Sequence, residues 1–378
     1  MTGFHTPFDG AGGGSSGALV PYPGQGATRS FPPDYFYNVN KQQNSRILRY
    51  ARTDIINPVL RYANYYIDGP RMGSTFAKIA SGAAAAIDCG IEFPLGTYTQ
   101  GTFGGVVGGT IANGGELSSD PITITIPKGS IFVERNNFQC AAGIIITENG
   151  GYAALGDKWE GAVSGLANKV MGGTISNASF VYAAISITSQ IDQPSWMPLG
   201  DSLTRGLVDT IDPPGDKGFL ARLIGPSAGY ILAAEEGLQA AHVVANNDYL
   251  ISLASSVSHV PVALGTNDIL IGGKTAAQII TSLAAIYNLF PTKKVLGCTI
   301  IPSPVFTAPQ HVIRQTVNDF IRSRTHFELA DPVETDRNSN TAKTGMFNAD
   351  NIHLNQTGFK TVAAYPPNVA LLNRLMAG

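Results

Sequence analysis

The chain has 378 residues, of which 44% are hydrophobic and only 14% are charged, and its formal net charge is −2. Nucleic-acid partners normally require a basic surface, so this balance predicts no nucleic-acid binding. No stretch approaches the roughly 18 uninterrupted apolar residues of a membrane-spanning helix, so we expect no membrane span. The length predicts two or three soluble domains with sizeable hydrophobic cores.

Residues 1–30 combine glycine, serine and proline without an apolar period. This composition predicts a flexible leader or linker. The segment lacks the basic start and the apolar stretch of a secretory signal. The location therefore stays open between an intracellular or virion-associated protein and the mature form of a secreted one, with a secreted or extracellular protein as the favoured alternative.

Residues 31–193 show apolar residues at every second position in several stretches. The clearest examples are Ala85, Ile87, Cys89, Ile91 and Phe93, then Ile122, Ile124 and Ile126, and also Leu60, Tyr62, Asn64 and Tyr66. A period of two with intervening turns predicts half-buried antiparallel strands. We therefore expect an all-β sandwich of jelly-roll type over residues 31–193.

The tyrosines of this half allow two interpretations. Tyr62, Tyr65, Tyr66 and Tyr98 could stack on sugar rings and make the domain a glycan-binding one. Aromatic residues are also favoured in strands simply because they pack well there. We prefer packing, with the domain forming one wall of a catalytic cleft.

Three cysteines occur in the chain. Cys89 and Cys298 fall in apolar strand patterns and are expected to be small core residues. Cys140 could form a disulfide with Cys89, but nothing in the sequence fixes their distance. Free thiols are the preferred interpretation.

Residues 194–378 alternate between short apolar runs and helical patterns. Runs at 194–199, 260–264 and 294–301 predict buried parallel strands. A helical face follows Thr275, and another follows Pro309; the apolar positions are Ala276, Ile279, Ile280, Leu283, Ile286 and Tyr287, then Val312, Ile313, Val317, Phe320 and Ile321. This alternation predicts a three-layer α/β/α domain of flavodoxin-like type.

Three polar blocks in this half carry reactive side chains: Gly200-Asp201-Ser202-Leu203, Gly265-Thr266-Asn267-Asp268 and Asp350-Asn351-Ile352-His353. A serine hydroxyl is a poor nucleophile and needs an imidazole base, which in turn needs a carboxylate to orient it. Ser202, His353 and Asp350 fit these roles. The Asn267 amide and the Ser202 backbone N–H are candidate oxyanion donors. Asp201 and Asp268 are expected to hold their turns through side-chain to backbone hydrogen bonds.

The three blocks resemble the SGNH, or GDSL-type, serine hydrolase superfamily, over about the C-terminal half from Pro194. The resemblance implies ester hydrolysis through an acyl-enzyme. A fourth family block, Asn-x-Gly-x-x-Gly, is altered here to Glu235-Glu236-Gly237-Leu238-Gln239-Ala240. Gly237 matches the first glycine, and Ala240 stands where the second is expected, so either backbone N–H could complete the oxyanion hole. The β-rich half also resembles the accessory domain of some members, at Ser119-Asp120-Pro121.

These observations predict a serine esterase that hydrolyses short-chain esters, above all acetyl esters, with O-acetyl groups on carbohydrate as candidate substrates. A lipid or aryl ester hydrolase is the alternative within enzymes. A non-catalytic glycan-binding protein is the alternative outside them. No two histidines have metal-ligand spacing, so neither a metal nor a cofactor is expected. The predicted partner is a small ester or an acylated glycan.

Overall fold

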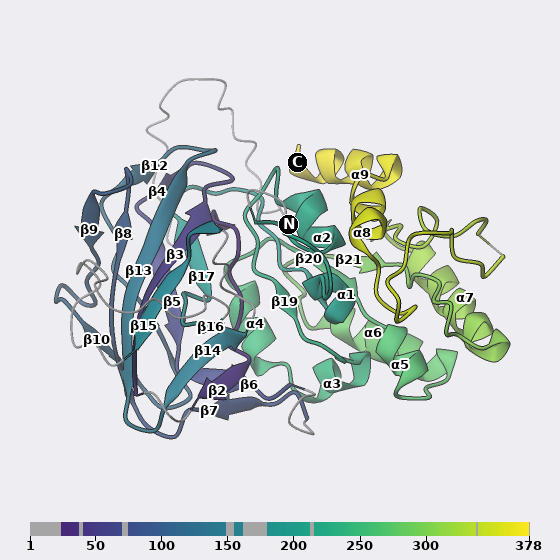
Figure 1. The fold of residues 1–378 in the computed structure, drawn as a ribbon, viewed down its shortest axis with the longest axis horizontal. Helices are drawn as coiled ribbons and strands as arrows, with labels where there is room; N and C mark the ends of the chain where they lie inside the picture. Colours follow the sequence, from purple (N-terminus) through teal and green to yellow (C-terminus); the bar gives the residue numbers. More distant parts are fainter. Residues whose placement is uncertain are drawn as a thin grey trace.

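The computed structural model describes residues 24–37, 41–69, 75–148, 155–161, 180–211, 215–337 and 339–377. Figure 1 shows a β-rich part, coloured purple to teal, beside a part that contains the helices, coloured teal to yellow. Most of the predicted leader, residues 1–23, lies outside the described residues. The domain boundaries at residues 30 and 193 otherwise remain a prediction.

The β-rich part consists of short and long strands joined by turns. Its strands are β1 (Gly24–Gln25), β2 (Tyr35–Tyr37), β3 (Gln42–Tyr50), β4 (Ile55–Ile56), β5 (Val59–Ala63), β6 (Tyr65–Ile67), β7 (Lys78–Ala80), β8 (Ala85–Glu92), β9 (Tyr98–Gln100), β10 (Gly109–Ile111), β11 (Glu116–Ser118), β12 (Thr125–Ile126), β13 (Ile131–Cys140), β14 (Ile144–Glu148), β15 (Lys158–Gly161), β16 (Phe180–Val181) and β17 (Ser186–Ser189).

Two antiparallel sheets form most of this part. The six-stranded sheet has the order β10-β8-β13-β3-β15, with β9 paired to β8, and the four-stranded sheet has the order β1-β17-β5-β11. The predicted strand at residues 85–93 is confirmed as β8. The pattern at Ile122 to Ile126 forms only the two-residue strand β12, although Ile122 and Ile126 are buried as expected.

The core of the β-rich part lies between these two sheets. Ile87, Cys89 and Phe138 from the six-stranded sheet belong to one buried cluster with Leu60 and Ile187 from the four-stranded sheet. Close-packed apolar side chains on facing sheets are the main stabilising contribution in such a layer. The three cysteines of the chain are free and buried, as preferred from the sequence.

Strand β5 departs from the predicted half-buried pattern. Its neighbours β17 and β11 pair with it on both edges, and Val59 and Ala63 are buried as well as Leu60 and Tyr62. Tyr62 and Tyr65 are both 0% exposed, so neither ring is open to a sugar. Packing is therefore the correct interpretation for these two tyrosines.

Residues 24–30 are not a flexible leader, and that part of the prediction is wrong. Gln25 and Ser30 are fully buried. Strand β1 pairs with β17, the Gln25 N–H donates to the Ser256 carbonyl (2.8 Å), and the Leu232 N–H donates to the Ser30 carbonyl (2.8 Å). The glycine-rich composition gave no indication that the backbone of residues 24–30 hydrogen-bonds to both parts of the molecule.

The second part contains a parallel sheet and all the described helices. Its strands are β18 (Leu199–Gly200), β19 (Ala233–Ala234), β20 (His259–Ala263), β21 (Lys294–Cys298) and β22 (His326–Phe327). Its helices are α1 (Ser202–Arg205), α2 (Phe219–Ile224), α3 (Ala240–Ala245), α4 (Asp248–Ala254), α5 (Thr266–Leu270), α6 (Ala276–Asn288), α7 (Ala308–Arg322), α8 (Gln356–Ala363) and α9 (Pro366–Met376).

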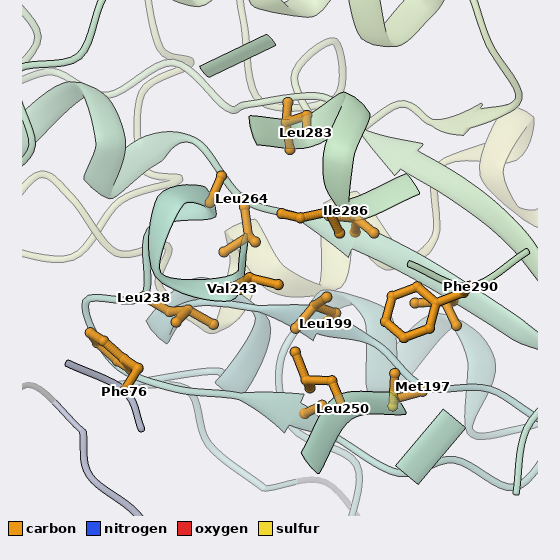
Figure 2. Close-up of a cluster of buried hydrophobic side chains, with 14 of the residues drawn as sticks. Phe76, Met197, Leu199, Leu238, Val243, Leu250, Leu264, Leu283, Ile286 and Phe290 are labelled. Carbon is orange, nitrogen blue, oxygen red and sulfur yellow. The ribbon is translucent and has the colours of Figure 1, made fainter. Parts of the chain in front are cut away.

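The parallel sheet has the order β19-β18-β20-β21-β22, in which the first strand of the part lies between the second and the third. This is the flavodoxin-like order that the alternating pattern predicted. Helices α3, α4, α6 and α7 contribute to the buried cluster on one face, and α2, α8 and α9 to that on the other. Figure 2 shows part of the first cluster, in which Leu199 of the sheet is drawn with Val243, Leu250 and Leu283 from the helices.

Helix α6 follows the sequence closely, whereas α7 does not. Thr275 caps α6 by accepting a hydrogen bond from the Gln278 N–H (3.3 Å). The Gln278 side chain in turn accepts a hydrogen bond from the Thr275 backbone N–H, which completes a capping box. On α7, Val312 is 62% exposed, so its assignment to the apolar face was wrong. Arg314 and Asn318 are buried on that helix instead, because their side chains find polar partners within the fold.

Candidate active site

The predicted nucleophile lies on a tight turn between β18 and α1. Asp201 caps the helix, its Oδ1 accepting a hydrogen bond from the Leu203 N–H (3.0 Å), as expected from the sequence. A side chain at Gly200 would collide with Thr204 and lie 2.9 Å from the Ala263 carbonyl, so glycine is required there. Ser202, which opens the helix, is 7% exposed.

The structure brings Ser202, His353 and Asp350 together. The Ser202 Oγ lies 2.8 Å from the His353 Nε2, and the Asp350 Oδ2 lies 2.7 Å from the His353 Nδ1. Asp350 also accepts hydrogen bonds from the backbone N–H groups of Ile352 and His353, each 2.9 Å, through its Oδ1. This is the hydrogen-bonded chain of nucleophile, base and orienting carboxylate.

The ionised form of the Asp350 carboxylate is stabilised beside the His353 ring. Burial opposes the effect, but hydrogen bonds from the backbone N–H and ring of His353 and from the Ile352 N–H hold the pKa of Asp350 below its ordinary value. An ionised carboxylate at Nδ1 favours the tautomer that leaves Nε2 free to accept the proton of Ser202.

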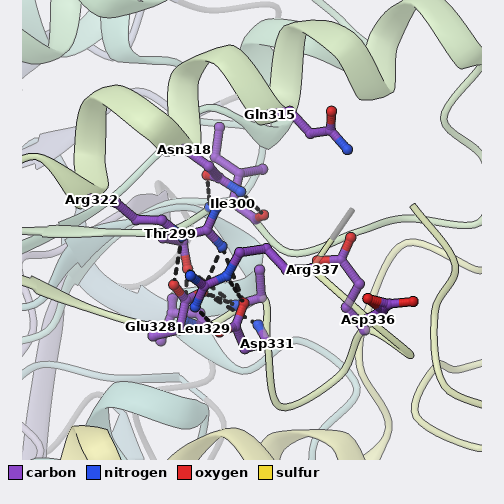
Figure 3. A network of polar contacts seen from close by, with 12 residues as sticks. Thr299, Ile300, Gln315, Asn318, Arg322, Glu328, Leu329, Asp331, Asp336 and Arg337 are labelled. Carbon is purple, nitrogen blue, oxygen red and sulfur yellow. Dashed lines mark hydrogen bonds and ion pairs between the residues drawn. The ribbon is translucent and has the colours of Figure 1, made fainter. Parts of the chain in front are cut away.

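A polar network supports the loop that carries His353. The Ser303 hydroxyl donates to the Asn351 carbonyl (2.8 Å), and the preceding Ile300 N–H donates to the Asn318 side chain on α7 (2.7 Å). Figure 3 shows the network around Thr299, whose hydroxyl donates to the Glu328 carboxylate (2.6 Å), itself bound by Arg322 of α7. The loops after β21 and β22 are thereby tied to one helix.

Asn267 lies between the nucleophile turn and the loop of the altered fourth block. Its Nδ2 donates to the Asp201 Oδ2 (3.3 Å) and to the Leu238 carbonyl (3.4 Å). Asp201 directly precedes Ser202, and Leu238 directly follows Gly237. Asn267 therefore links the two segments that hold the other candidate oxyanion donors.

The two candidates of the altered block differ in what their backbone N–H groups bind. The Ala240 N–H donates to both carboxylate oxygens of Asp268, at 3.0 and 3.1 Å. Asp268 thus anchors the start of α3. Among the described residues, no acceptor binds the backbone N–H of Gly237 or of Ser202. Gly237 also has a φ of 76°, a conformation that favours glycine.

Asp201 has an unusual protonation equilibrium for a cap. Burial raises the pKa of Asp201 to about 7, and the nearby Asp268 carboxylate adds to this, whereas hydrogen bonds from backbone N–H groups, chiefly that of Leu203, oppose it. The side chain therefore exchanges its proton near neutral pH, one residue from the candidate nucleophile.

Replacing Asp201 with asparagine is expected to change how stability depends on pH. Because the folded pKa is raised, the folded wild type retains a proton that the unfolded chain loses between pH ~4 and ~7, so its free energy of unfolding falls across this window. The variant lacks this loss. Between pH 4 and pH 8 its free energy of unfolding should therefore rise, relative to that of the wild type, by at most about 4 kcal/mol. Urea unfolding at both pH values measures the difference, and parallel pH profiles would contradict it.

Arg205 forms a buried ion cluster that the sequence did not indicate. Its guanidinium binds the Asp34 carboxylate from the β-rich part and the Glu235 carboxylate (3.1 Å), and its side chain is 13% exposed. Burial would lower the pKa of Arg205, but the two carboxylates more than offset this and raise it. Asp34 lies 171 positions away in the chain, so no local pattern could have paired them.

The described residues offer neither a metal-ion cluster nor a membrane-crossing helix. Within the described ranges, no three His, Cys, Asp or Glu side chains lie close enough together to hold a metal ion. In the same part of the chain, no helix has both the length and the apolar character needed to cross a membrane.

No model of a known protein family matches the chain, and no curated protein matches its sequence. Several solved structures are similar to it. An acetyl esterase is 18% identical, matching 48% of this chain and 100% of its own, with a TM-score of 0.36. The family 3 carbohydrate esterase of Clostridium thermocellum is 16% identical, matching 49% and 99%, with a TM-score of 0.38. A lipolytic protein of the G-D-S-L family from Desulfitobacterium hafniense is 16% identical, matching 47% and 99%, with a TM-score of 0.39.

The similarity to G-D-S-L esterases expected from the sequence blocks is therefore present among solved structures, at low identity and over about half of the chain. At these TM-scores it carries no argument about function.

Proposed function

We propose that the protein is a serine esterase in which Ser202 is the nucleophile, His353 the general base and acid, and Asp350 the residue that orients His353. The observation that carries this proposal is the continuous chain of contacts from Ser202 Oγ through the two nitrogens of His353 to Asp350, at 2.8 and 2.7 Å. A serine on a helix start with this arrangement is equipped for acyl transfer.

The reaction follows from these positions. Ser202 Oγ attacks the ester carbonyl while its proton passes to His353 Nε2. The tetrahedral intermediate collapses as His353 returns this proton to the leaving alcohol, and an acyl group remains on Ser202. Water then attacks the acyl-enzyme while His353 takes its proton, and the second intermediate collapses as His353 returns that proton to Ser202 Oγ, which releases the carboxylic acid and restores the free serine. Asp350 stays ionised and stabilises the imidazolium in both steps.

The oxyanion of each intermediate is proposed to accept hydrogen bonds from the Ser202 N–H, the Gly237 N–H and the Asn267 amide. The backbone donors at Ser202 and Gly237 are not engaged by a described acceptor, whereas the Ala240 N–H is held by Asp268. This difference favours Gly237 over Ala240 as the donor of the altered block. The two backbone donors are fixed in place before the charge forms, which makes them effective, whereas the Asn267 amide has to exchange its long contact with the Leu238 carbonyl (3.4 Å) for the oxyanion.

Replacing Asn267 with alanine is expected to lower kcat by about 10²- to 10³-fold with little change in KM, because the lost hydrogen bond forms mainly in the transition state. Steady-state kinetics on p-nitrophenyl acetate measures both constants. Asn267→Asp keeps the size of the side chain but offers no amide donor, and it should be at least as inactive. A kcat within about twofold of wild type for both variants would exclude Asn267 from the oxyanion hole.

We propose a short acyl group, acetyl in particular, as the substrate, with O-acetylated carbohydrate as the source. Ser202 is 7% exposed and the His353 side chain 14%, and a small acyl group requires the least space beside two such largely buried groups. A lipid or aryl ester hydrolase is the alternative within enzymes. A glycan-binding protein without activity is the other alternative.

Hydrolysis of p-nitrophenyl esters from acetate to palmitate distinguishes these possibilities. The proposal expects kcat/KM to be highest for acetate and to fall steeply with chain length. Release of acetate from an acetylated polysaccharide, measured alongside, tests the carbohydrate source. A preference for palmitate would move the assignment to lipids, and no hydrolysis of any ester would leave the non-catalytic alternative.

A further inference from the structure

The outward face of the six-stranded sheet is hollowed by a groove of about 340 Å³, which we call the outer groove. The residues that line it and bear on its chemistry are Ala86, Asp88, Gly109, Thr110, Asn137 and Gln139. They come from β8, β10 and β13, three neighbouring strands of one sheet. The outer groove is therefore built on regular structure rather than on a single loop.

The register of the strands explains why this face is polar. Asn137 of β13 lies opposite Asp88 of β8, and Gln139 lies opposite Ala86. Side chains alternate between the two faces of a strand, so the intervening Ile87 and Phe138 point to the core instead.

The outer groove faces away from the part of the molecule that holds Ser202. The inner face of the six-stranded sheet packs on the four-stranded sheet, and Arg61 of that second sheet reaches across to the Ser252 carbonyl of α4 (3.0 Å). Figure 1 shows β8, β9 and β10 on the side opposite to the helices. A ligand in the outer groove therefore does not meet the catalytic residues.

The lining offers hydrogen-bonding groups of both kinds. The Asp88 carboxylate accepts from the Gln100 side chain (2.7 Å), and the Asn137 carbonyl accepts from the side-chain amides of Gln139 (3.1 Å) and Gln42 (3.4 Å), so these two buried groups hold the floor of the groove in place. Thr110 and Gln139 are exposed and add a hydroxyl and an amide. No lysine or arginine is among the described lining residues, which disfavours an anionic ligand next to Asp88.

Apolar side chains also occur close in sequence to the lining residues or on the same face of the sheet. Val106 and Val107 are 62% and 50% exposed, and they directly precede the lining segment that contains Gly109 and Thr110. Tyr98 lies on the same face of the sheet, where its hydroxyl donates to the Cys89 carbonyl (3.1 Å). Polar groups in a fixed array beside a small apolar surface match a sugar ring, which presents hydroxyl groups at its edge and C–H groups on its faces.

We propose that the outer groove binds a neutral polysaccharide chain. Such a site goes beyond the proposed esterase and stands without it, since none of its residues touches Ser202, His353 or Asp350. If the esterase acts on an acylated polymer, the site holds the enzyme on that polymer and raises the local concentration of ester groups.

Affinity electrophoresis of the full chain tests the proposal, in gels containing glucomannan, arabinoxylan, hydroxyethyl cellulose or soluble starch, with alginate as the acidic comparison. At least one neutral polymer should retard the protein. Two variants change exposed positions of the groove. One combines Thr110→Ala with Gln139→Ala, and the other is Ala86→Arg, which fills the outer groove. Each should weaken the retardation about tenfold or more. Asn373→Ala, an exposed amide of α9, is the matched control and should not change it.

The outcomes are separable from those of the esterase proposal. Both groove variants should retain wild-type kcat/KM on p-nitrophenyl acetate, and Ser202→Ala should be retarded as strongly as the wild type. Loss of ester hydrolysis with retardation intact would sink only the proposed catalysis. No retardation by any neutral polymer, equal retardation of the groove variants, or stronger retardation by alginate would overturn the polysaccharide site.

Discussion

Replacing Ser202 with alanine is expected to lower kcat on p-nitrophenyl acetate by about 10⁴-fold or more while leaving the fold intact. The hydroxyl that forms the acyl-enzyme is lost, and only the oxyanion donors and substrate binding remain. The side chain is small and lies at the start of α1, so its removal creates little cavity. Steady-state kinetics and thermal unfolding measure the two effects separately.

A matched control sharpens this test. Ser323 is an exposed serine just after α7, and Ser323→Ala should leave both kcat and the melting temperature near those of the wild type. If Ser202→Ala retained more than about a tenth of wild-type activity, Ser202 would not be the nucleophile, whatever the hydrogen bond to His353 suggests.

Replacing Arg205 with methionine is expected to lower the free energy of unfolding by about 3–5 kcal/mol, because Asp34 and Glu235 would be left as buried carboxylates without their cation. Urea unfolding measures the loss. A fall in kcat should accompany it, since Glu235 lies two residues before Gly237 and Arg205 three residues after Ser202. The comparison is Arg374→Met on the exposed side of α9, which should change stability by less than about 0.5 kcal/mol.

A compensating variant separates lost charge pairing from lost packing. Asp34→Asn and Glu235→Gln, added to Arg205→Met, remove the stranded charges and should restore much of the lost stability. If the triple variant is no more stable than Arg205→Met alone, packing of the long side chain rather than ion pairing is the main contribution.

Local patterns were sufficient to predict the elements that place the catalytic groups. The apolar run before Asn267 predicted β20, the cap at Thr275 predicted the start of α6, and the order of runs and helices predicted the flavodoxin-like sheet. The three polar blocks also predicted that Ser202 and His353 would meet, because a serine nucleophile needs an imidazole base beside it.

Contacts between distant segments could not be read from these patterns. Nothing near Arg205 indicates Asp34 as its partner, and nothing in the sequence of α3 shows that the Ala240 N–H binds Asp268. On α7, Arg314 and Asn318 take inward positions that a hydrophobic pattern assigns to apolar residues, because Glu334 and the Ile300 carbonyl satisfy them. Burial of polar groups depends on partners that only the folded chain supplies.

The segment of residues 24–37 means that the two parts are not interchangeable modules. It is the first segment of the β-rich part in sequence, yet Gln25 and Ser30 hydrogen-bond to backbone of the α/β part, and Asp34 neutralises Arg205 within it. An α/β fragment cut out after Gln193 would expose these backbone groups and leave the buried Arg205 without its Asp34 partner. Grafting the α/β part onto another partner domain therefore requires carrying this distant segment along with it.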